Sequence, residues 1–138
     1  MERIADRLHS AAIHLLRRLR MEDEALGISA PRLSVLSVLV FAGPRRIGEL
    51  ARIEQVEPPT MTRLVDGLVR DGLAIREAVP DDARAVLVRA TAEGRRTLRL
   101  GRARRLERLS AALGDLPPDD LAALGGGVDV LERVLHEP

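Results

Sequence analysis

The sequence predicts a mainly α-helical fold that carries one small β-hairpin. The chain has 138 residues and is 46% hydrophobic, but its single aromatic residue is Phe41. The core must therefore be built from Leu, Val, Ile and Ala, and Leu and Ala are strong helix formers. Residues 73–91 contain two runs typical of strands, LAIREAV and AVLVRAT, around the turn-forming segment PDDAR. This length favours one domain, residues 1–138.

Two helices are predicted in the first third of the chain. Residues 2–20 are amphipathic, because apolar residues recur there at helical spacing: Ile4, Leu8, Ala11, Leu15 and Leu19. The segment MEDEALGI is predicted to be a linker. Ser29 is a favourable N-cap for a second helix with Pro31 in its first turn, and Gly43 and Pro44 are expected to end it.

Two further helices are predicted over residues 46–53 and 58–71, with a turn between them. The first should face Ile47, Leu50 and Ala51 inward. The second begins with two prolines, ends before Gly72 and carries a buried stripe of Met61, Leu64, Val65 and Leu68. The polar residues left on its other faces are Thr60, Thr62, Arg63, Asp66 and Arg70.

The remainder of the chain predicts two longer helices. Thr91 can cap the first, over residues 92–113, whose first half is rich in arginine; these arginines could follow a DNA backbone or form a solvated face that pairs with Glu93 and Glu107. The second begins near Asp119 and carries a coiled-coil-like seam of Leu121, Leu124, Val128, Leu131 and Leu135. Gly125–Gly127 interrupt this seam, which indicates either a kink or the close approach of another backbone.

The order helix, helix, helix, strand, turn, strand is that of a winged helix-turn-helix. In this architecture the third helix of the motif enters the major groove of DNA with its N-terminal residues at the base edges. Threonine and arginine suit that place, and the arginines before the shorter helix are candidates for phosphate contacts. The predicted DNA-contacting residues are Arg45, Arg46, Pro59, Thr60, Thr62, Arg63, Asp82 and Arg84.

Composition and charge exclude several other classes. The net charge is +1, but residues 57–108 hold 12 arginines and 8 acidic residues, whereas residues 109–138 hold one arginine and 6 acidic residues. The absence of cysteine excludes thiol chemistry, and no apolar run is long enough to span a membrane. His9 and His14 are not spaced as a metal-binding pair, and no phosphate-binding loop is present. We therefore expect a cytoplasmic protein that is not an enzyme and has no metal, cofactor or membrane partner.

The segment TRLVDGLVRDGLAIREAVPDDARAVLVRATAEG resembles the MarR family of bacterial transcription regulators. Leu68–Leu73 match the family's Leu-x-x-x-Gly-Leu element. Asp82-Ala83-Arg84 match its Asp-x-Arg wing tip, and Thr91–Gly94 match its Thr-x-x-Gly helix start. Many members carry a second basic residue at the wing tip where this chain has Ala83, so Arg84 is expected to make the wing contacts alone.

The resemblance implies a homodimeric regulator of double-stranded DNA, most often a repressor at a pseudo-palindromic operator. It assigns residues 29–91 to a DNA-binding lobe and residues 1–20 and 92–138 to dimerisation, and it implies that Arg84 enters the minor groove, held by Asp82 or Glu57. The apolar seams predict a dimer interface of Ile4, Leu8, Leu15, Leu121, Leu124, Val128, Leu131 and Leu135.

Many members of the family also bind a small phenolic or anionic effector. The family binds such compounds between the dimer helices and the DNA-binding lobe, and the resemblance implies that His14, Arg17 and Arg20 face this cleft. The alternative to a DNA regulator is a dimeric helical or winged-helix module that binds another protein without reading a DNA sequence.

Overall fold

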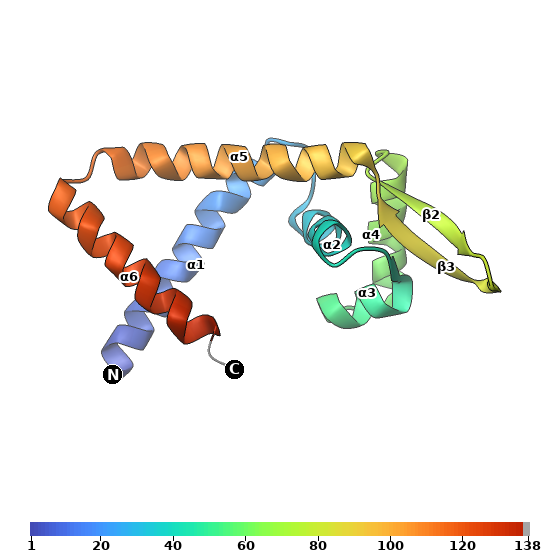
Figure 1. Ribbon diagram of the computed structural model, residues 1–138, viewed down its shortest axis with the longest axis horizontal. Helices are drawn as coiled ribbons and strands as arrows, with labels where there is room; N and C mark the ends of the chain where they lie inside the picture. The colour runs from blue at the N-terminus through green and yellow to red at the C-terminus, as the bar shows by residue number, and fades with distance from the viewer. Residues whose placement is uncertain (137–138) are drawn as a thin grey trace. The chain divides into compact units, whose positions relative to one another are not determined.

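The computed structural model describes residues 1–136 as a series of helices interrupted by one hairpin (Figure 1). The predicted mainly helical winged helix-turn-helix is confirmed. Glu137 and Pro138, the end of the predicted dimerisation segment, lie outside the described residues. The elements in chain order are α1 Glu2–Glu24, α2 Ala30–Phe41, β1 Arg45–Arg46, α3 Ile47–Glu54, α4 Pro58–Arg70, β2 Ala74–Val79, β3 Asp82–Ala90, α5 Ala92–Gly114 and α6 Pro118–His136.

The core lies where α2, α3, α4 and the sheet pack together. Its largest fully buried side chains come from all of these elements: Leu36, Leu39, Leu50, Met61, Leu68, Val35, Val65 and Val88. The stripe predicted for α4 is therefore correct, with Leu64 partly buried at its edge. Burial of one face of α4 leaves its opposite face free for a ligand.

The sheet has one strand that the sequence did not predict. Its order is β1-β3-β2, and both pairings are antiparallel. β1 consists of Arg45 and Arg46, opposite Val88 and Leu87 of β3. Two arginines carry no strand propensity, so only the neighbouring edge of β3 explains their extended conformation.

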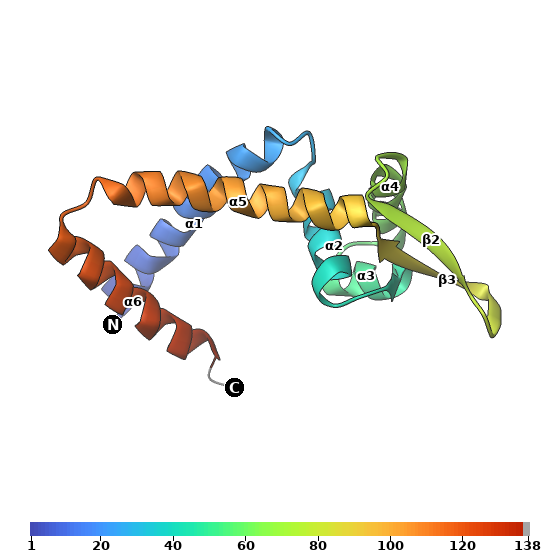
Figure 2. The same cartoon turned by 45° about the horizontal axis from the view of Figure 1, so that its top comes forward.

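The hairpin turn is shorter than predicted. We expected residues 80–84 to form the turn, but β3 already begins at Asp82, which pairs with Val79 across the two-residue turn Pro80–Asp81. A register shift between Ala78 and Val79 accommodates this pairing. Asp82 and Arg84 are therefore strand residues at the hairpin tip, and both views show this tip projecting away from the helices (Figures 1 and 2).

The junction of the hairpin with α4 and α5 explains why the sequence needs glycine and threonine there. Gly72 follows α4 with a φ of +72°, where glycine is favoured. The Thr91 hydroxyl donates to the Gly72 carbonyl at 2.7 Å and accepts from the Gly94 amide at 3.0 Å, so the predicted cap is confirmed. A Cβ on Gly94 would lie 2.2 Å from the Leu73 carbonyl oxygen. α5 can therefore begin this close to the hairpin only with glycine at that position.

Two local predictions need correction, and one of the two alternatives for Gly125–Gly127, a close approach by another backbone, finds no counterpart among the described residues. The linker expected at residues 21–28 is helical as far as Glu24, because Met and Glu favour helix and the first positive φ comes at Gly27. Ser29 holds the N-cap position of α2, but its hydroxyl accepts from Arg32 Nε at 3.4 Å rather than from the backbone. At Gly125–Gly127, α6 continues, and a Cβ at each would meet no described atom within 4 Å.

The chain divides into two compact units, residues 1–103 and residues 104–138. The first contains the winged helix and α1, and the second contains the end of α5 and α6. None of the helices in residues 1–136 combines the length and apolar character that crossing a bilayer requires. In the same residues, no three His, Cys, Asp or Glu side chains come together as metal ligands would.

Candidate nucleic-acid interface

The outward face of α4 carries the residues predicted to read bases. Met61, Val65 and Leu68 hold the inner face, so the polar positions that alternate with them point away from the core. The predicted residues of this face are all exposed, and the structure brings them together in the first two turns of the helix: Pro59, Thr60, Thr62 and Arg63. Arg70, which the sequence placed on an outward face but not among the predicted DNA contacts, is exposed and lies seven residues after Arg63 on the same side of the helix.

The start of α4 has a distinctive set of free groups. Pro58 and Pro59 occupy its first positions and bring no amide N–H, and there is no acidic side chain in its first turn. The Met61 amide already donates to the Glu57 carbonyl at 3.1 Å, so Thr60 is left with a free amide in this turn. The Thr62 hydroxyl donates to the Pro58 carbonyl at 3.0 Å. Thr62 can therefore offer DNA a lone pair and a methyl group, but not its proton.

The wing presents Arg84 near its tip. Asp82 Oδ1 accepts from the Arg84 backbone amide at 3.1 Å, so Asp82 fixes the backbone that carries Arg84. The expectation that Asp82 or Glu57 would hold the Arg84 side chain has no counterpart among the ion pairs of residues 1–136. The exposed guanidinium is thus available to a partner.

Arg45 and Arg46 differ in their surroundings. Arg45 is half-buried opposite Val88, and its Nη1 donates to the Pro44 carbonyl at 2.8 Å. Arg46 is exposed as the N-cap residue of α3, and its amide donates to Glu49 Oε2 at 2.9 Å. Of the two predicted phosphate contacts, Arg46 is therefore the more accessible.

Two ion pairs flank α4, and sequence reasoning predicted neither. Arg32 of α2 donates to Asp71 at the end of α4, with Nη1 and Oδ2 2.5 Å apart. Arg76 of β2 donates through Nη2 to Asp66 Oδ1 on α4. The partners are 39 and 10 residues apart in sequence, so no local spacing signals them.

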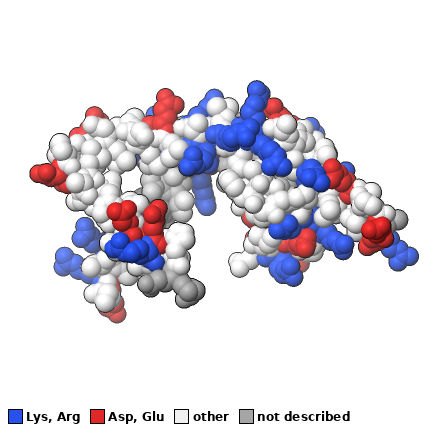
Figure 3. All heavy atoms as spheres, viewed as in Figure 1, with Lys and Arg blue, Asp and Glu red and all other residues white. Residues whose placement is uncertain are grey.

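The arginines of α5 form a basic surface over its first half, visible as a blue row in Figure 3. Arg96 pairs with Glu93 at 3.1 Å, which agrees with the solvated-face alternative at that position. Arg95, Arg99 and Arg102 line a hollow of about 170 Å³ together with Val40, Phe41 and Leu98.

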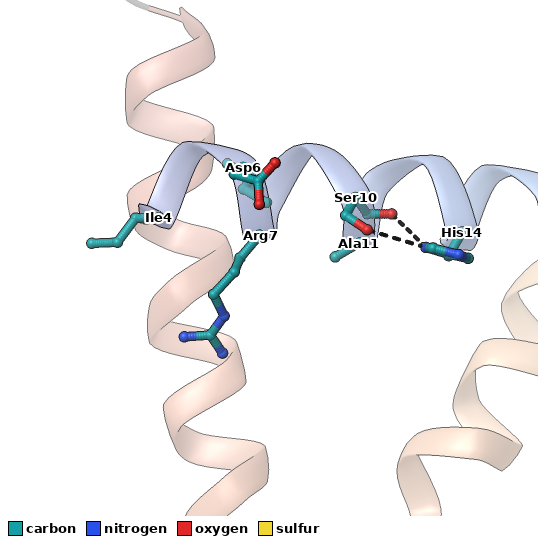
Figure 4. A pocket seen from close by; sticks show the side chains of 7 residues that line it. Ile4, Asp6, Arg7, Ser10, Ala11 and His14 are labelled. Atoms are coloured by element: carbon teal, nitrogen blue, oxygen red, sulfur yellow. Dashed lines mark hydrogen bonds between the residues drawn. The ribbon is translucent and has the colours of Figure 1, made fainter. Parts of the chain in front are cut away.

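The effector candidates do not line one common hollow. His14 lines a hollow of about 580 Å³ on α1 with Ile4, Arg7 and Leu8 (Figure 4), and its Nδ1 lies 2.8 Å from the Ser10 carbonyl oxygen. Arg17 and Arg20 line a separate hollow of about 160 Å³ with Ile13 and Leu16.

The predicted dimer residues are accessible in the single chain. Leu131 is half-buried, and the other seven are exposed, from 40% for Leu121 to 71% for Leu135. No residue of α6 is buried.

The chain closely resembles known regulators along its whole length. The model of the MarR family matches residues 28–86. An uncharacterized HTH-type transcriptional regulator of Mycobacterium leprae is 33% identical over 135 residues, which is 98% of this chain and 94% of that protein. The structure of a regulator from Pseudomonas aeruginosa, described as putative, is similar with a TM-score of 0.83 at 30% identity, over 99% of this chain and 96% of that one. An S. aureus MepR mutant bound to an oligodeoxyribonucleotide has a TM-score of 0.77 at 16% identity, over 96% of this chain and 98% of that one.

A winged helix-turn-helix with an exposed polar helix face and an arginine on its wing defines a DNA-binding protein. The sequence and structural similarities place this chain in the MarR family of transcriptional regulators. Members of this family are non-enzymatic DNA-binding proteins, so the chain is a DNA-binding regulator and not an enzyme.

Proposed function

We propose that this regulator is a homodimeric repressor that reads a pseudo-palindromic operator with α4 and the wing. The observation that carries the proposal is the exposure, in one lobe, of Thr60 and Arg63 at the start of α4 and of Arg84 at the hairpin tip. A helix start suits the major groove, and an arginine on a projecting hairpin suits the negative potential of a narrow minor groove. MepR shows that a protein of this fold can be crystallised with DNA.

In this proposal Arg63 forks onto a guanine, and Thr60, Thr62 and Pro59 contact neighbouring bases or phosphates. Arg46 and, less directly, Arg45 contact the backbone next to the N-terminus of α3. Asp82 supports Arg84 through the hydrogen bond to its amide. These roles divide the interface into residues that specify sequence and residues that position the protein.

Dimerisation is proposed through the apolar faces of α1 and α6. α6 exposes Leu121, Leu124, Val128 and Leu135, and α1 exposes Ile4, Leu8 and Leu15. Contiguous apolar surface of this kind usually marks an interface. Two copies would present two copies of α4, as a pseudo-palindrome requires. Because a DNA-binding regulator acts where the chromosome is, we propose that the protein is cytoplasmic.

We also propose that a small phenolic or anionic effector releases the protein from DNA. The cationic Arg17 and Arg20, with His14 one helical turn earlier, would attract a negative charge to α1. The test is displacement of the protein from its operator by salicylate and benzoate, measured for wild type and for an Arg17→Ala, Arg20→Ala variant. Equal displacement of both proteins would remove these residues from the proposal.

The experiment that tests the DNA-binding proposal is binding-site selection from random duplexes, followed by titration of the selected duplex over a salt series. We expect one enriched, pseudo-palindromic sequence and an affinity that falls steeply with salt concentration, because bound phosphates release counterions. Failure to enrich any sequence, or an affinity independent of salt, would favour the alternative of a winged-helix module that binds protein.

A further inference from the structure

We propose that Asp66 and Arg76 are positioning residues for DNA recognition: their ion pair fixes the rotation of α4 about its own axis, together with the Arg32–Asp71 pair on the opposite flank. The inference rests on the proposed function, since it assigns a role within the same interface. If this is so, Asp66, a negatively charged residue on the DNA-facing side of α4, is required for tight binding to DNA.

The two ion pairs hold α4 from different sides. Asp66 and Asp71 are five residues apart, which places them about 140° apart around the helix axis at 3.6 residues per turn. By the same spacing, the proposed base-reading residue Arg63 projects between them, about 60° from Asp66 and about 80° from Asp71. One flank is tied to the wing strand β2 and the other to α2.

Arg76 reaches α4 because of its register in the sheet. It lies opposite Val88, which is fully buried, and on the same face as Ala74 and Ala90, which are also buried. That face packs towards the helices, so the long side chain at position 76 reaches Asp66 of α4 although Arg76 remains exposed to solvent. The other arginine of this part of the sheet, Arg89, is on the opposite face, where it pairs with Glu77 at 2.9 Å.

The opposite flank depends on a glycine. Gly67 is buried in α4, and a Cβ there would lie 2.9 Å from Arg32 Cδ and 3.1 Å from Arg32 Nη1. The absence of a side chain therefore lets Arg32 cross α4 closely and reach Asp71. Glycine in a helix interior is destabilising relative to alanine, so its presence here fits a packing role.

Small rotations of α4 affect base reading directly. A guanidinium about 8 Å from the helix axis moves by roughly 3 Å when the helix turns by about 20°, which is the length of a hydrogen bond. A buried apolar side chain about 6 Å from the axis moves by roughly 2 Å in the same turn, so core packing limits the rotation and the ion pairs set the position of α4 within that limit. Loss of the Asp66–Arg76 pair should therefore reduce sequence recognition while the fold and the general attraction to phosphates persist.

The test compares Asp66→Asn with wild type on two duplexes, the selected operator and a scrambled duplex of equal length. Electrostatics alone predicts that removal of an acid beside DNA strengthens binding to both. The proposal predicts weaker binding to the operator. Since exposed ion pairs contribute little individually, we expect roughly a threefold loss per protomer and about tenfold for two half-sites. Binding to scrambled DNA should be unchanged or tighter.

Three further variants separate positioning from other roles. Asp81→Asn, in the exposed turn of the wing, makes the same charge change without breaking an ion pair of the described residues and should not weaken binding. Asp66→Glu keeps the charge and should retain most of the affinity. In an Arg76→Ala background, Asp66→Asn should cause no further loss, because the partner is already gone.

The salt dependence of DNA binding distinguishes a positioning role of Arg76 from a direct contact with phosphate. If Arg76 acts through α4, the plot of log affinity against log salt for Arg76→Ala should run parallel to that of wild type. A slope lower by about one unit would mean a direct phosphate contact and would overturn the proposal, as would Asp66→Asn binding the operator as tightly as wild type. If wild type selects no duplex, the proposed function itself fails, and the positioning role fails with it. Circular dichroism confirms that each variant is folded.

Discussion

The winged lobe and the terminal helices of this chain differ in how they bury apolar side chains. Within residues 1–136, every buried apolar side chain falls between Ile28 and Leu98. α1 and α6 are also amphipathic, yet large apolar residues on both helices remain 40% to 71% exposed. Amphipathicity therefore serves two purposes in one chain. In the lobe it builds a core, and in the terminal helices it provides surface that a second copy can cover.

This difference suggests that the two regions respond differently to mutation. A change in the lobe should alter the free energy of unfolding whatever the protein concentration. A change in the terminal seam should act through association and so depend on concentration. The following substitutions test this division, from the largest expected effect to the smallest.

Leu131→Arg should have the largest effect, because it places a charge in the proposed dimer seam. A charge buried in an apolar interface without a partner costs several kcal/mol, enough to dissociate a dimer of ordinary affinity. Light scattering should show a monomer or an aggregate. A stable Leu131→Arg dimer would show that the seam of α6 is not the interface.

The same substitution in the two regions provides a matched pair. Leu36 is 0% exposed and Leu124 is 44% exposed. Leu36→Ala should lower the free energy of unfolding by about 2–5 kcal/mol, through lost burial and the cavity that remains. Leu124→Ala should change it by less than about 1 kcal/mol under dilute, monomeric conditions. Urea unfolding at two protein concentrations measures both, and similar losses for the two variants in dilute solution would contradict the division.

We expect substitutions of the DNA-facing arginines to distinguish base contacts from phosphate contacts. Arg63→Ala should weaken operator binding by about 1–3 kcal/mol and relax preference at one base position, because it removes a base-edge contact. Arg46→Ala should weaken binding to all duplexes alike, since a phosphate contact carries no sequence information. Binding-site selection with both variants is the measurement. An unchanged motif and affinity for Arg63→Ala would mean that α4 is not the reading helix.

The features that the sequence could predict are those that depend on neighbouring residues. The order of helices, the inner stripe of α4 and the cap at Thr91 follow from local periodicity and capping chemistry, and the structure has all three. The strand at Arg45–Arg46, the Asp66–Arg76 pair and the Arg32–Asp71 pair depend on contacts between residues distant in sequence. Local spacing and propensity do not reveal which distant residues come into contact.

At the hairpin tip, too, local propensity did not predict which residues pair. The residues PDDAR all favour turns, so propensity predicted a longer turn than the one that forms. Strand pairing between Val79 and Asp82 overrides this preference and extends β3 to the tip. The predicted DNA residues Asp82 and Arg84 keep their place on the wing, but on a strand; Asp82 is paired with Val79, whereas Arg84 lies within the register shift.

In the proposed division of roles, the winged lobe contacts DNA, and the terminal helices pair two copies without contacting DNA. The most direct test is titration of the operator with an Arg63→Ala, Arg84→Ala variant, at fixed salt because phosphate contacts change with ionic strength. Duplexes with A·T-rich and G·C-rich flanks are compared, and the oligomeric state is measured in parallel. We predict an intact dimer that has lost operator binding, with the contribution of Arg84 greatest on A·T-rich flanks, where a narrow minor groove attracts arginine. Equal affinity of the variant and wild type across the flank series would contradict the account.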